Sequence, residues 1–262
     1  MNLVWAIQSN LVNSADVEKL TRACQATGVA STLFQTIPFS DQLPEVATDR
    51  PALFYGSTGC MAAIHRSKRW DPGVFFDEQN FRFSGWKKAW GDAILNAESE
   101  VTTIEQLSQR AYPPERTFFL RPCDDSKAFA GEVMNFYEIQ VWCRSLQEEE
   151  CQLKPDCPIV VAEPVGIADE WRLFVIDGRV STGSHYRSHH RLDVFPGVPD
   201  EVVDFAQGLA ALWRPSPVFV MDVARSGGTL YVIEINCFNS SGFYASDVGR
   251  LVADVTRFVE AR

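Results

Sequence analysis

The chain has 262 residues, of which 46% are hydrophobic and 12% aromatic, which supports one large core or several smaller ones and excludes a disordered chain. Its 24 Lys and Arg against 34 Asp and Glu give a net charge of −10, which disfavours a large non-specific surface for nucleic acid or anionic membranes. The start MNLVWAIQSN lacks the pattern of a signal peptide, and no stretch approaches the ~20 apolar residues of a membrane span. We therefore expect a cytoplasmic protein without membrane contacts.

The first half of the chain alternates strand and helix signals. LVWAI is typical of a strand, and the apolar spacing that follows predicts a helix that Ser14 caps and Gly28 ends. VASTLF and PALFYGS are two further strands. This order predicts a small α/β domain with a partly parallel sheet.

A turn of small residues, Gly56-Ser57-Thr58-Gly59, follows the third strand and leads into a helix. It matches neither of the two glycine-rich phosphate motifs, so a tight strand-to-helix turn is the first interpretation. The second is an anion or substrate contact at the start of the helix, which the later basic residues Arg66, Lys68 and Arg69 would assist.

The pattern changes at Pro113-Pro114, where we place a domain boundary between residues 1–112 and 113–262. Before it we expect a helix around Trp86, Trp90 and Ile94, and the segment VTTIEQLSQ. After it, RTFFLRP and PIVVAEPV are typical of strands, with the helix NFYEIQVWCRSLQ between them. Two long hairpins follow, separated by a helix near EVVDFAQGLAALW, and a helix from Asp247 to about Glu260 closes the chain.

The first hairpin, EWRLFVIDGRVSTGSHYR, contains an Asp177-Gly178 pair of the kind favoured in two-residue turns. A regular register opposes Arg172 to Gly183. One face would then carry Glu170, Arg172, His185 and Arg187. The packing face would carry Trp171, Leu173, Val175, Val180 and Tyr186. His185 on the charged face is a candidate for substrate contact, whereas the His185, His189 and His190 cluster lacks the helical frame that would favour zinc.

The second hairpin, VFVMDVARSGGTLYVIEINCF, places Glu234 and Asn236 on one face of an apolar strand. A strict Gly227-Gly228 turn puts Asp222 on the opposite face, whereas a three-residue loop or a bulge puts it opposite Glu234. The apolar pattern favours the second arrangement, because it groups Phe219, Met221 and Val223 with Tyr231, Ile233 and Ile235. Two carboxylates and an amide oxygen are ligands suited to Mg²⁺, although two acids can equally flank an arginine.

Three segments occur in an order that resembles the ATP-grasp fold: FLRP-x4-K, VVAEPV-x4-EWRLFVIDGRV and VMDVA…LYVIEIN. They resemble most its divergent clade marked by an arginine and lysines, the R-two-K clade. The resemblance covers about residues 115 to 262. It implies an α/β plus α+β protein, in which a small pre-ATP-grasp domain (1–112) precedes an ATP-grasp domain with subdomains 113–158 and 159–262 that hold ATP between them.

The resemblance also implies roles for single residues. Arg121 stands where the family commonly has a nucleotide-binding lysine, and Lys127 falls in the loop that covers the phosphates, although this loop lacks the usual glycines. The hinge strand that meets adenine corresponds to Val161, Ala162, Glu163 and Val165. Arg172 and Arg187 match positions that meet the γ-phosphate or an acyl-phosphate. Asp222, Glu234 and Asn236 match the Mg²⁺ ligands.

The activity implied is an ATP- and Mg²⁺-dependent ligase that joins a carboxylate to an amine through an acyl-phosphate. An ATP-dependent kinase of a small molecule is the alternative enzyme, because the same site can deliver phosphate to a hydroxyl. A nucleotide-binding module without activity is the third hypothesis. The carboxylate and amine substrates stay open among small molecules, peptides and proteins.

Overall fold

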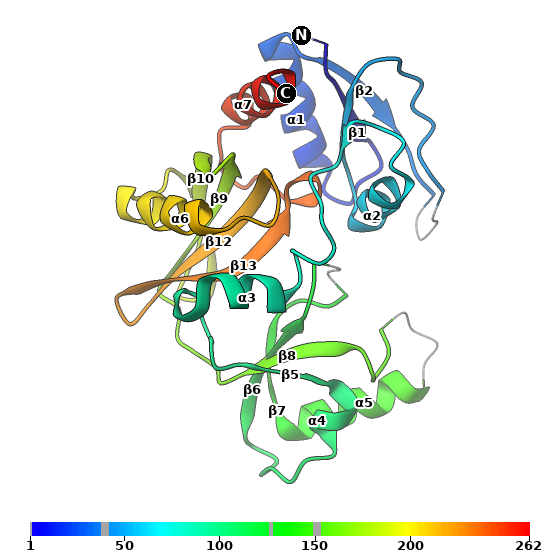
Figure 1. Cartoon of the computed structure of the whole chain (residues 1–262). Helices are drawn as coiled ribbons and strands as arrows, with labels where there is room; N and C mark the ends of the chain where they lie inside the picture. Colours follow the sequence, from blue (N-terminus) through cyan, green and yellow to red (C-terminus); the bar gives the residue numbers. More distant parts are fainter. Residues whose placement is uncertain (1, 38–41, 126–127, 149–152) are drawn as a thin grey trace.

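The computed structural model describes residues 2–37, 42–125, 128–148 and 153–262. They form three sheets: in Figure 1 the N-terminal sheet lies at the top, the C-terminal sheet below it, and the sheet within residues 100–162, called the middle sheet for its place in the sequence, at the bottom. The amino and carboxyl ends lie near each other at the top (Figure 1). No helix in the described part of the chain combines the length and the apolar character needed to cross a membrane.

The N-terminal sheet is parallel and has the order β2-β1-β3-β4. Its strands are β1 (Val4–Gln8), β2 (Ala30–Phe34), β3 (Ala52–Tyr55) and β4 (Pro72–Gly73), with helices α1 (Ser14–Thr27) and α2 (Thr58–Ser67). Helix α1 begins at Ser14 and ends at Gly28, whose φ of 67° suits glycine at a helix C-terminus. Its N-cap position is Asn13, so Ser14 is the first helical residue and not the predicted cap.

The middle sheet is antiparallel and has the order β5-β8-β6-β7. It consists of β5 (Glu100–Thr103), β6 (Thr117–Pro122), β7 (Glu132–Asn135) and β8 (Pro158–Ala162), with α4 (Ile104–Ser108) and α5 (Phe136–Glu148). The two helices cover one face of it over a core that includes Ile139 and Leu120. Because β5 and α4 precede residue 113 yet belong to this unit, we propose that the first ATP-grasp subdomain begins near residue 100 and not at 113.

The C-terminal sheet is antiparallel and has the order β11-β10-β9-β12-β13. Its strands are β9 (Asp169–Ile176), β10 (Arg179–Ser188), β11 (Arg191–Pro196), β12 (Val218–Ser226) and β13 (Thr229–Cys237). The accompanying helices are α3 (Phe83–Trp90), η1 (Gly91–Ala93), α6 (Asp200–Leu212), η2 (Phe238–Ser240) and α7 (Val248–Glu260). Helix α3 ends before Ile94, which the sequence pattern predicts to be helical and which instead forms a bridge with Val232 of β13.

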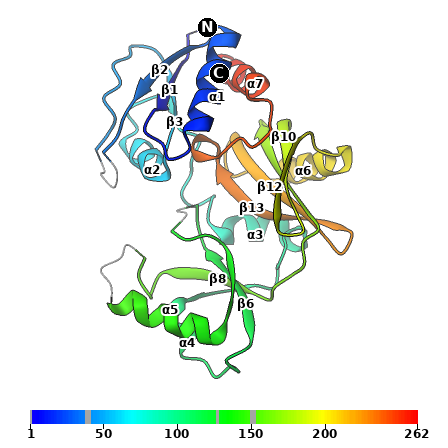
Figure 2. The same cartoon turned by 180° about the vertical axis from the view of Figure 1, so that it is seen from behind.

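The two faces of the C-terminal sheet differ in what covers them. Alternate residues of one face, such as Leu173 and Met221, pack under α3 and α6. Phe174 and Val220 of the other face pack with α1 and α7, which ties the N-terminal sheet to this one (Figure 2). Farther along the same strands this second face becomes polar. The site lies on that polar part.

Candidate functional site

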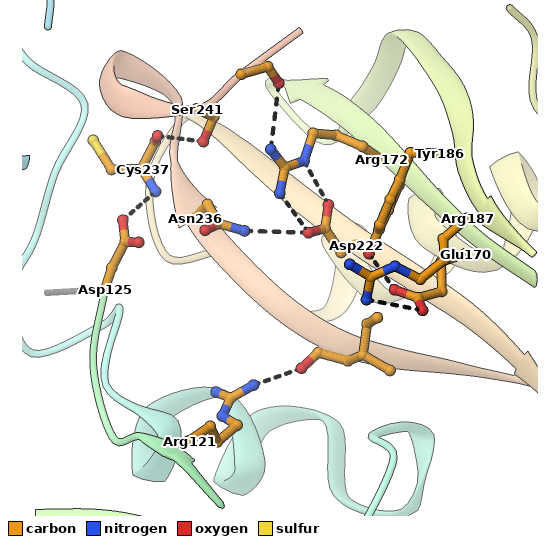
Figure 3. A network of polar contacts seen from close by, with 12 residues as sticks. Arg121, Asp125, Glu170, Arg172, Tyr186, Arg187, Asp222, Asn236, Cys237 and Ser241 are labelled. Atoms are coloured by element: carbon orange, nitrogen blue, oxygen red, sulfur yellow. Dashed lines mark hydrogen bonds and ion pairs between the residues drawn. The ribbon is translucent and has the colours of Figure 1, made fainter. Parts of the chain in front are cut away.

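Asp222, Glu234 and Asn236 lie together on the polar face. The register sets Asp222 of β12 directly opposite Glu234 of β13. The Asn236 side-chain nitrogen lies 3.4 Å from the Asp222 carboxylate (Figure 3). The side chains of Asp222 and Asn236 are buried, whereas Glu234 is exposed. The structure therefore brings together the three oxygen-bearing side chains that the sequence singled out.

A bulge in β13 produces this arrangement. Ser226 pairs with Thr229 across a two-residue Gly227-Gly228 turn, and the register shifts by one residue between the Asp222 and Val223 pairs. The extra residue is Ile233, because Asp222 pairs with Glu234 and Val223 pairs with Val232. Bulges re-aim side chains in this way next to functional sites.

The bulge also corrects one predicted set of core residues. The sequence pattern predicts that Tyr231 and Ile233 pack with Met221, but Leu230 and Val232 do so. The reason is that the shift at Ile233 exchanges the two faces for the part of β13 that lies nearer the turn. Beyond the bulge, Ile235 packs as expected.

Arg172 of β9 forms a two-pronged ion pair with Asp222. Its Nε lies 2.9 Å from Oδ1 and its Nη2 lies 2.7 Å from Oδ2, and Nη1 donates to the Gly242 carbonyl at 3.3 Å. Burial lowers the pKa of Arg172, but the Asp222 carboxylate outweighs burial, so the pKa lies above its ordinary value. Asp222 thus pairs with an arginine and also faces a second acid, Glu234, so both arrangements considered from the sequence occur here.

The first hairpin differs from its predicted register. The turn at Asp177-Gly178 pairs Ile176 with Arg179 as expected, but β10 carries register shifts between Val180 and Thr182 and between His185 and Arg187. Arg172 therefore pairs with Ser184 and not with Gly183. The two irregularities exchange the expected faces of two aromatic residues of β10.

The first of these residues, His185, lies on the packing side, against Trp171 and stacked on Phe195 with ring centroids 4.3 Å apart. Its two ring nitrogens meet the Asp193 carbonyl at 2.7 Å and the Asp169 carboxylate at 3.1 Å. The prediction that His185 belongs to the charged face is therefore wrong.

Tyr186 takes the place on the charged face instead. Its hydroxyl donates to the buried Glu170 carboxylate at 2.5 Å, and burial, with the carboxylates of Asp222 and Glu170, raises its pKa well above the ordinary value. Arg187 reaches the same Glu170 at 3.5 Å and is half-exposed. The charged face thus holds Glu170, Arg172, Tyr186 and Arg187 (Figure 3).

Tyr244 lies against the charged face, and no sequence pattern predicts it there. Its ring stacks on Tyr186 with centroids 4.8 Å apart and planes 6° apart, and the Arg172 guanidinium lies 5.0 Å from its centroid. Its φ is 48°, an unfavourable value for a bulky residue, and Lys19 of α1 holds its carbonyl at 2.7 Å. Strained residues of this kind concentrate at functional sites.

Arg121 reaches the bulge of β13 from the middle sheet. Its Nη1 donates to the Ile233 carbonyl at 2.6 Å, and its guanidinium lies 4.9 Å from the Trp86 ring centroid and 5.4 Å from that of Phe83. Burial lowers the pKa of Arg121 while Glu234 opposes that effect. Its buried Nε has no hydrogen-bond partner among the described residues. Such a buried donor is costly unless a ligand accepts from it.

The hinge candidates occupy the end of β8. The side chains of Val161 and Ala162 are buried, and Val161 pairs with strands on both sides. Strand β8 ends at Ala162, so Glu163 and Val165 follow it outside the ladder. The Glu163 side chain is exposed and pairs with Arg116 at 2.6 Å.

Lys127 lies outside the described residues. Just before it, the Asp125 carboxylate accepts the Cys237 backbone N–H at 2.6 Å, which joins the loop after β6 to the end of β13 (Figure 3). The segment that leads to Lys127 is thus anchored beside Asn236.

The Gly56–Gly59 turn makes its polar contacts to other groups of the protein. Ser57 caps α2 by accepting from the Cys60 N–H, and the Ser57 N–H donates to the Gln8 side chain at 2.9 Å. Arg66 and Lys68 lie at the other end of this helix. The tight-turn interpretation therefore accounts for these contacts, and the basic residues do not join the turn.

The comparisons with known proteins agree with this geometry. A model of the ATP-grasp domain, family 3 of the R-two-K clade, matches residues 59–255. The chain belongs to the R-two-K clade of the ATP-grasp family. The family resemblance and the ATP-grasp fold expected from the sequence are confirmed.

Solved ATP-grasp structures share the fold over nearly the whole chain. The D-alanine–D-alanine ligase from Bacillus anthracis has a TM-score of 0.64 at 11% identity, and covers 100% of this chain and 97% of its own. The D-cycloserine synthetase DcsG has a TM-score of 0.62 at 15% identity, with coverages of 98% and 99%. The ligase PsnB with its minimal precursor has 0.59 at 15%, with the same coverages. No curated protein sequence matches the chain.

Proposed function

We propose that this ATP-grasp protein is an ATP- and Mg²⁺-dependent ligase that joins a carboxylate to an amine through an acyl-phosphate. The observation that carries the proposal is that Arg121 of the middle sheet reaches the bulge of β13, beside the position where Asp222 opposes Glu234. An acid pair suited to a cation thus lies next to a buried arginine with an unused donor, where the two subdomains meet. This arrangement fits a bound metal–phosphate group.

The donor set fits Mg²⁺. Asn236 directs its amide nitrogen toward Asp222, which leaves its oxygen for a cation, and each carboxylate oxygen accepts at more than one position even while Arg172 donates to it. Among the described residues, no group of three or more His, Cys, Asp or Glu could hold a metal, and the proposed set accordingly combines two carboxylates with one amide. We expect Asp222, Glu234 and Asn236 to hold Mg²⁺, which would neutralise the charge of the phosphates.

Nucleotide binding would use residues of both subdomains. Arg121 would donate its Nε to a phosphate oxygen, and Lys127 would add a second positive charge. Val161 and Ala162 would form part of the adenine pocket, and the backbone of Glu163 to Val165, which the sheet does not use, would meet the adenine edge. The exposed Glu163 side chain has no part in this contact.

The reaction itself needs positioning rather than a side-chain nucleophile. A substrate carboxylate oxygen would attack the γ-phosphorus and release ADP, and an amine would then attack the acyl carbon, release phosphate and lose a proton. Arg187 is half-exposed and held only weakly by Glu170, so it would orient the transferred phosphoryl group. Arg172 would act mainly by holding Asp222.

Hydroxylamine provides a direct test, because it intercepts acyl-phosphates as hydroxamates. The protein is incubated with ATP, Mg²⁺, hydroxylamine and pools of amino acids, peptides and other carboxylates, and ADP and hydroxamate are measured together. Equal amounts of ADP and hydroxamate with at least one pool are expected, with both products reduced about a hundredfold or more in the Glu234→Gln variant. ADP with a phosphorylated hydroxyl compound would indicate a kinase, and no ADP with any pool would indicate a binding module.

A further inference from the structure

Helix α5 has apolar residues on its outer face as well as on its inner face. Phe136, Ile139 and Cys143 point into the core of the middle sheet. Tyr137 and Val141, one helical turn apart, are 59% and 41% exposed. A helix that only covers a sheet presents polar residues to solvent, so this second apolar stripe has no explanation in the core.

The stripe borders a groove of about 510 Å³ between α5 and strand β7. Phe129 and Trp142 line it and meet edge to face with ring centroids 5.1 Å apart. Met134 of β7 lines it as well. Aromatic and flexible apolar walls of this kind accept an apolar side chain.

The strand beside the groove is the edge of its sheet. Within the described residues β7 pairs only with β6, so its other side is not part of a ladder. An extended peptide can add to such an edge through main-chain hydrogen bonds and place alternate side chains into a neighbouring groove. The groove next to β7 is positioned for those side chains.

The charge of the groove favours a basic occupant. Glu132 and Glu138 are both exposed and both line it, and no Lys or Arg among the described residues does. One Glu138 oxygen accepts the Asn135 N–H at 2.7 Å, which fixes the carboxylate in place. A second copy of the chain fits poorly, because the chain carries a net charge of −10.

From these contacts we propose that β7 and the outer face of α5 form a docking site for an extended peptide segment that combines apolar residues with Lys or Arg. The peptide adds as a strand beside β7, one apolar side chain enters the groove between Met134 and Trp142, and a basic side chain meets Glu132. This site lies apart from the nucleotide site and does not depend on the proposed ligase activity.

The test begins with a phage-displayed library of random 12-residue peptides, selected on the full chain and depleted on the Val141→Glu variant. The enriched peptides are expected to combine Lys or Arg with aliphatic or aromatic residues. The most enriched peptide, labelled with fluorescein, is then the probe for fluorescence anisotropy. Val141→Glu and Glu132→Lys are each expected to weaken its binding about tenfold or more, as the loss of a central contact does.

The matched control is Leu212→Glu, which adds the same charge at an exposed apolar residue of α6 and is expected to bind the probe like the wild type. A probe with alternate N-methylated amides is expected to lose binding, because it cannot pair with β7. Circular dichroism establishes that each variant folds. The proposal is overturned if no peptide is enriched, if the N-methylated probe binds equally, or if two differently charged variants, Val141→Glu and Val141→Lys, both bind like the wild type.

Discussion

Two arginines flank the acid pair, Arg172 beside Asp222 and Arg121 at the bulge near Glu234, and their surroundings differ in one respect. Each guanidinium lies over two aromatic rings, a pair of tyrosines for Arg172 and Phe83 with Trp86 for Arg121. Arg172 directs its donors to a carboxylate and a carbonyl. Arg121 donates to a main-chain carbonyl, and its buried Nε has no partner in the described part of the chain.

Because of this difference, we expect Arg172 to serve mainly stability and Arg121 to serve mainly ligand binding. The charge of Arg172 is neutralised within the protein, so removing it leaves the buried Asp222 carboxylate without compensation. The charge of Arg121 is only partly compensated, so a ligand anion would complete its surroundings. We therefore expect Arg172 variants to fail first in stability and Arg121 variants to fail first in nucleotide binding.

The largest expected effect is on stability in Arg172→Met. Breaking a buried ion pair by removing one partner costs about 3–5 kcal/mol, so the free energy of unfolding should fall by that order. Arg121→Met should lose less, about 1.5–3 kcal/mol, because it breaks one hydrogen bond from a charged donor to a carbonyl. Urea unfolding without nucleotide measures both. Adding Asp222→Asn to Arg172→Met should restore part of the loss, and equal losses in the two single variants would remove the distinction between the arginines.

The next effect is on turnover in Glu234→Gln. The change is nearly isosteric on an exposed side chain, so folding should be unaffected, but one negative charge leaves the proposed Mg²⁺ set. We expect ADP release to fall about a hundredfold or more, the size of effect seen when a group that stabilises the transition state is lost. ADP release is measured at a series of Mg²⁺ concentrations, which shows whether the loss comes from weaker Mg²⁺ binding.

Glu163→Gln is the matched control for Glu234→Gln. It removes the same charge from an exposed glutamate whose ion pair with Arg116 lies at the surface and is worth little. Its turnover should stay close to that of the wild type. Wild-type turnover in Glu234→Gln at every Mg²⁺ concentration would contradict the metal assignment.

The two hairpins show how far the sequence specifies this site. In the second hairpin, Met221 and Ile235 are purely apolar, so burying them predicts a register in which Asp222 meets Glu234, although a three-residue loop and a bulge both give that register. In the first hairpin, His185 and Tyr186 each carry an apolar ring and a polar end. Either face can accept them, so alternation alone could not locate the bulge that exchanges them.

Long-range pairing accounts for the rest of what the sequence could not predict. Strand β5 joins β8 across more than fifty intervening residues, and its local pattern contains no sign of that partner. Tyr244 likewise reaches the site because its backbone has a φ of 48° and because Lys19 of another sheet's helix holds it. The fold class, the Asp177-Gly178 turn and the acid pair were predictable because they depend on local pattern and on resemblance.

A smaller effect is expected on ATP affinity in Arg121→Lys. The substitution keeps one positive charge but removes the Nε donor and the planar group that lies over Trp86. Affinity for ATP with Mg²⁺, measured by calorimetry, should weaken about tenfold, which corresponds to ~1.4 kcal/mol. Arg116→Lys, at an exposed arginine of the same sheet, is the control and should bind ATP normally. An unchanged affinity in Arg121→Lys would assign Arg121 to packing alone.

The smallest effect concerns pH and tests the Tyr186–Glu170 contact on the Arg172 side. Burial raises the pKa of Tyr186, so above about pH 10 the unfolded chain ionises this phenol while the folded chain keeps it protonated, and stability falls as pH rises. Its contribution to that fall is at most about 1.4 kcal/mol per pH unit. Tyr186→Phe should therefore be less stable than the wild type at pH 8, by about 1–2 kcal/mol for the lost bond to Glu170, and should approach it at pH 11.

Urea unfolding at pH 8, 9.5, 10.5 and 11 measures this convergence, with pH values chosen to bracket the ordinary tyrosine pKa of about 10. Tyr55 is also buried with a raised pKa, so the variant should still lose stability at high pH, but along a shallower curve. Tyr137→Phe, at an exposed tyrosine, should follow the wild-type curve. If the curves of Tyr186→Phe and the wild type ran parallel from pH 8 to 11, the phenol would not be held protonated by its burial beside Glu170. The charged wall around Arg172 would then be open to solvent, and the contrast with Arg121 would rest on the Asp222 pair alone.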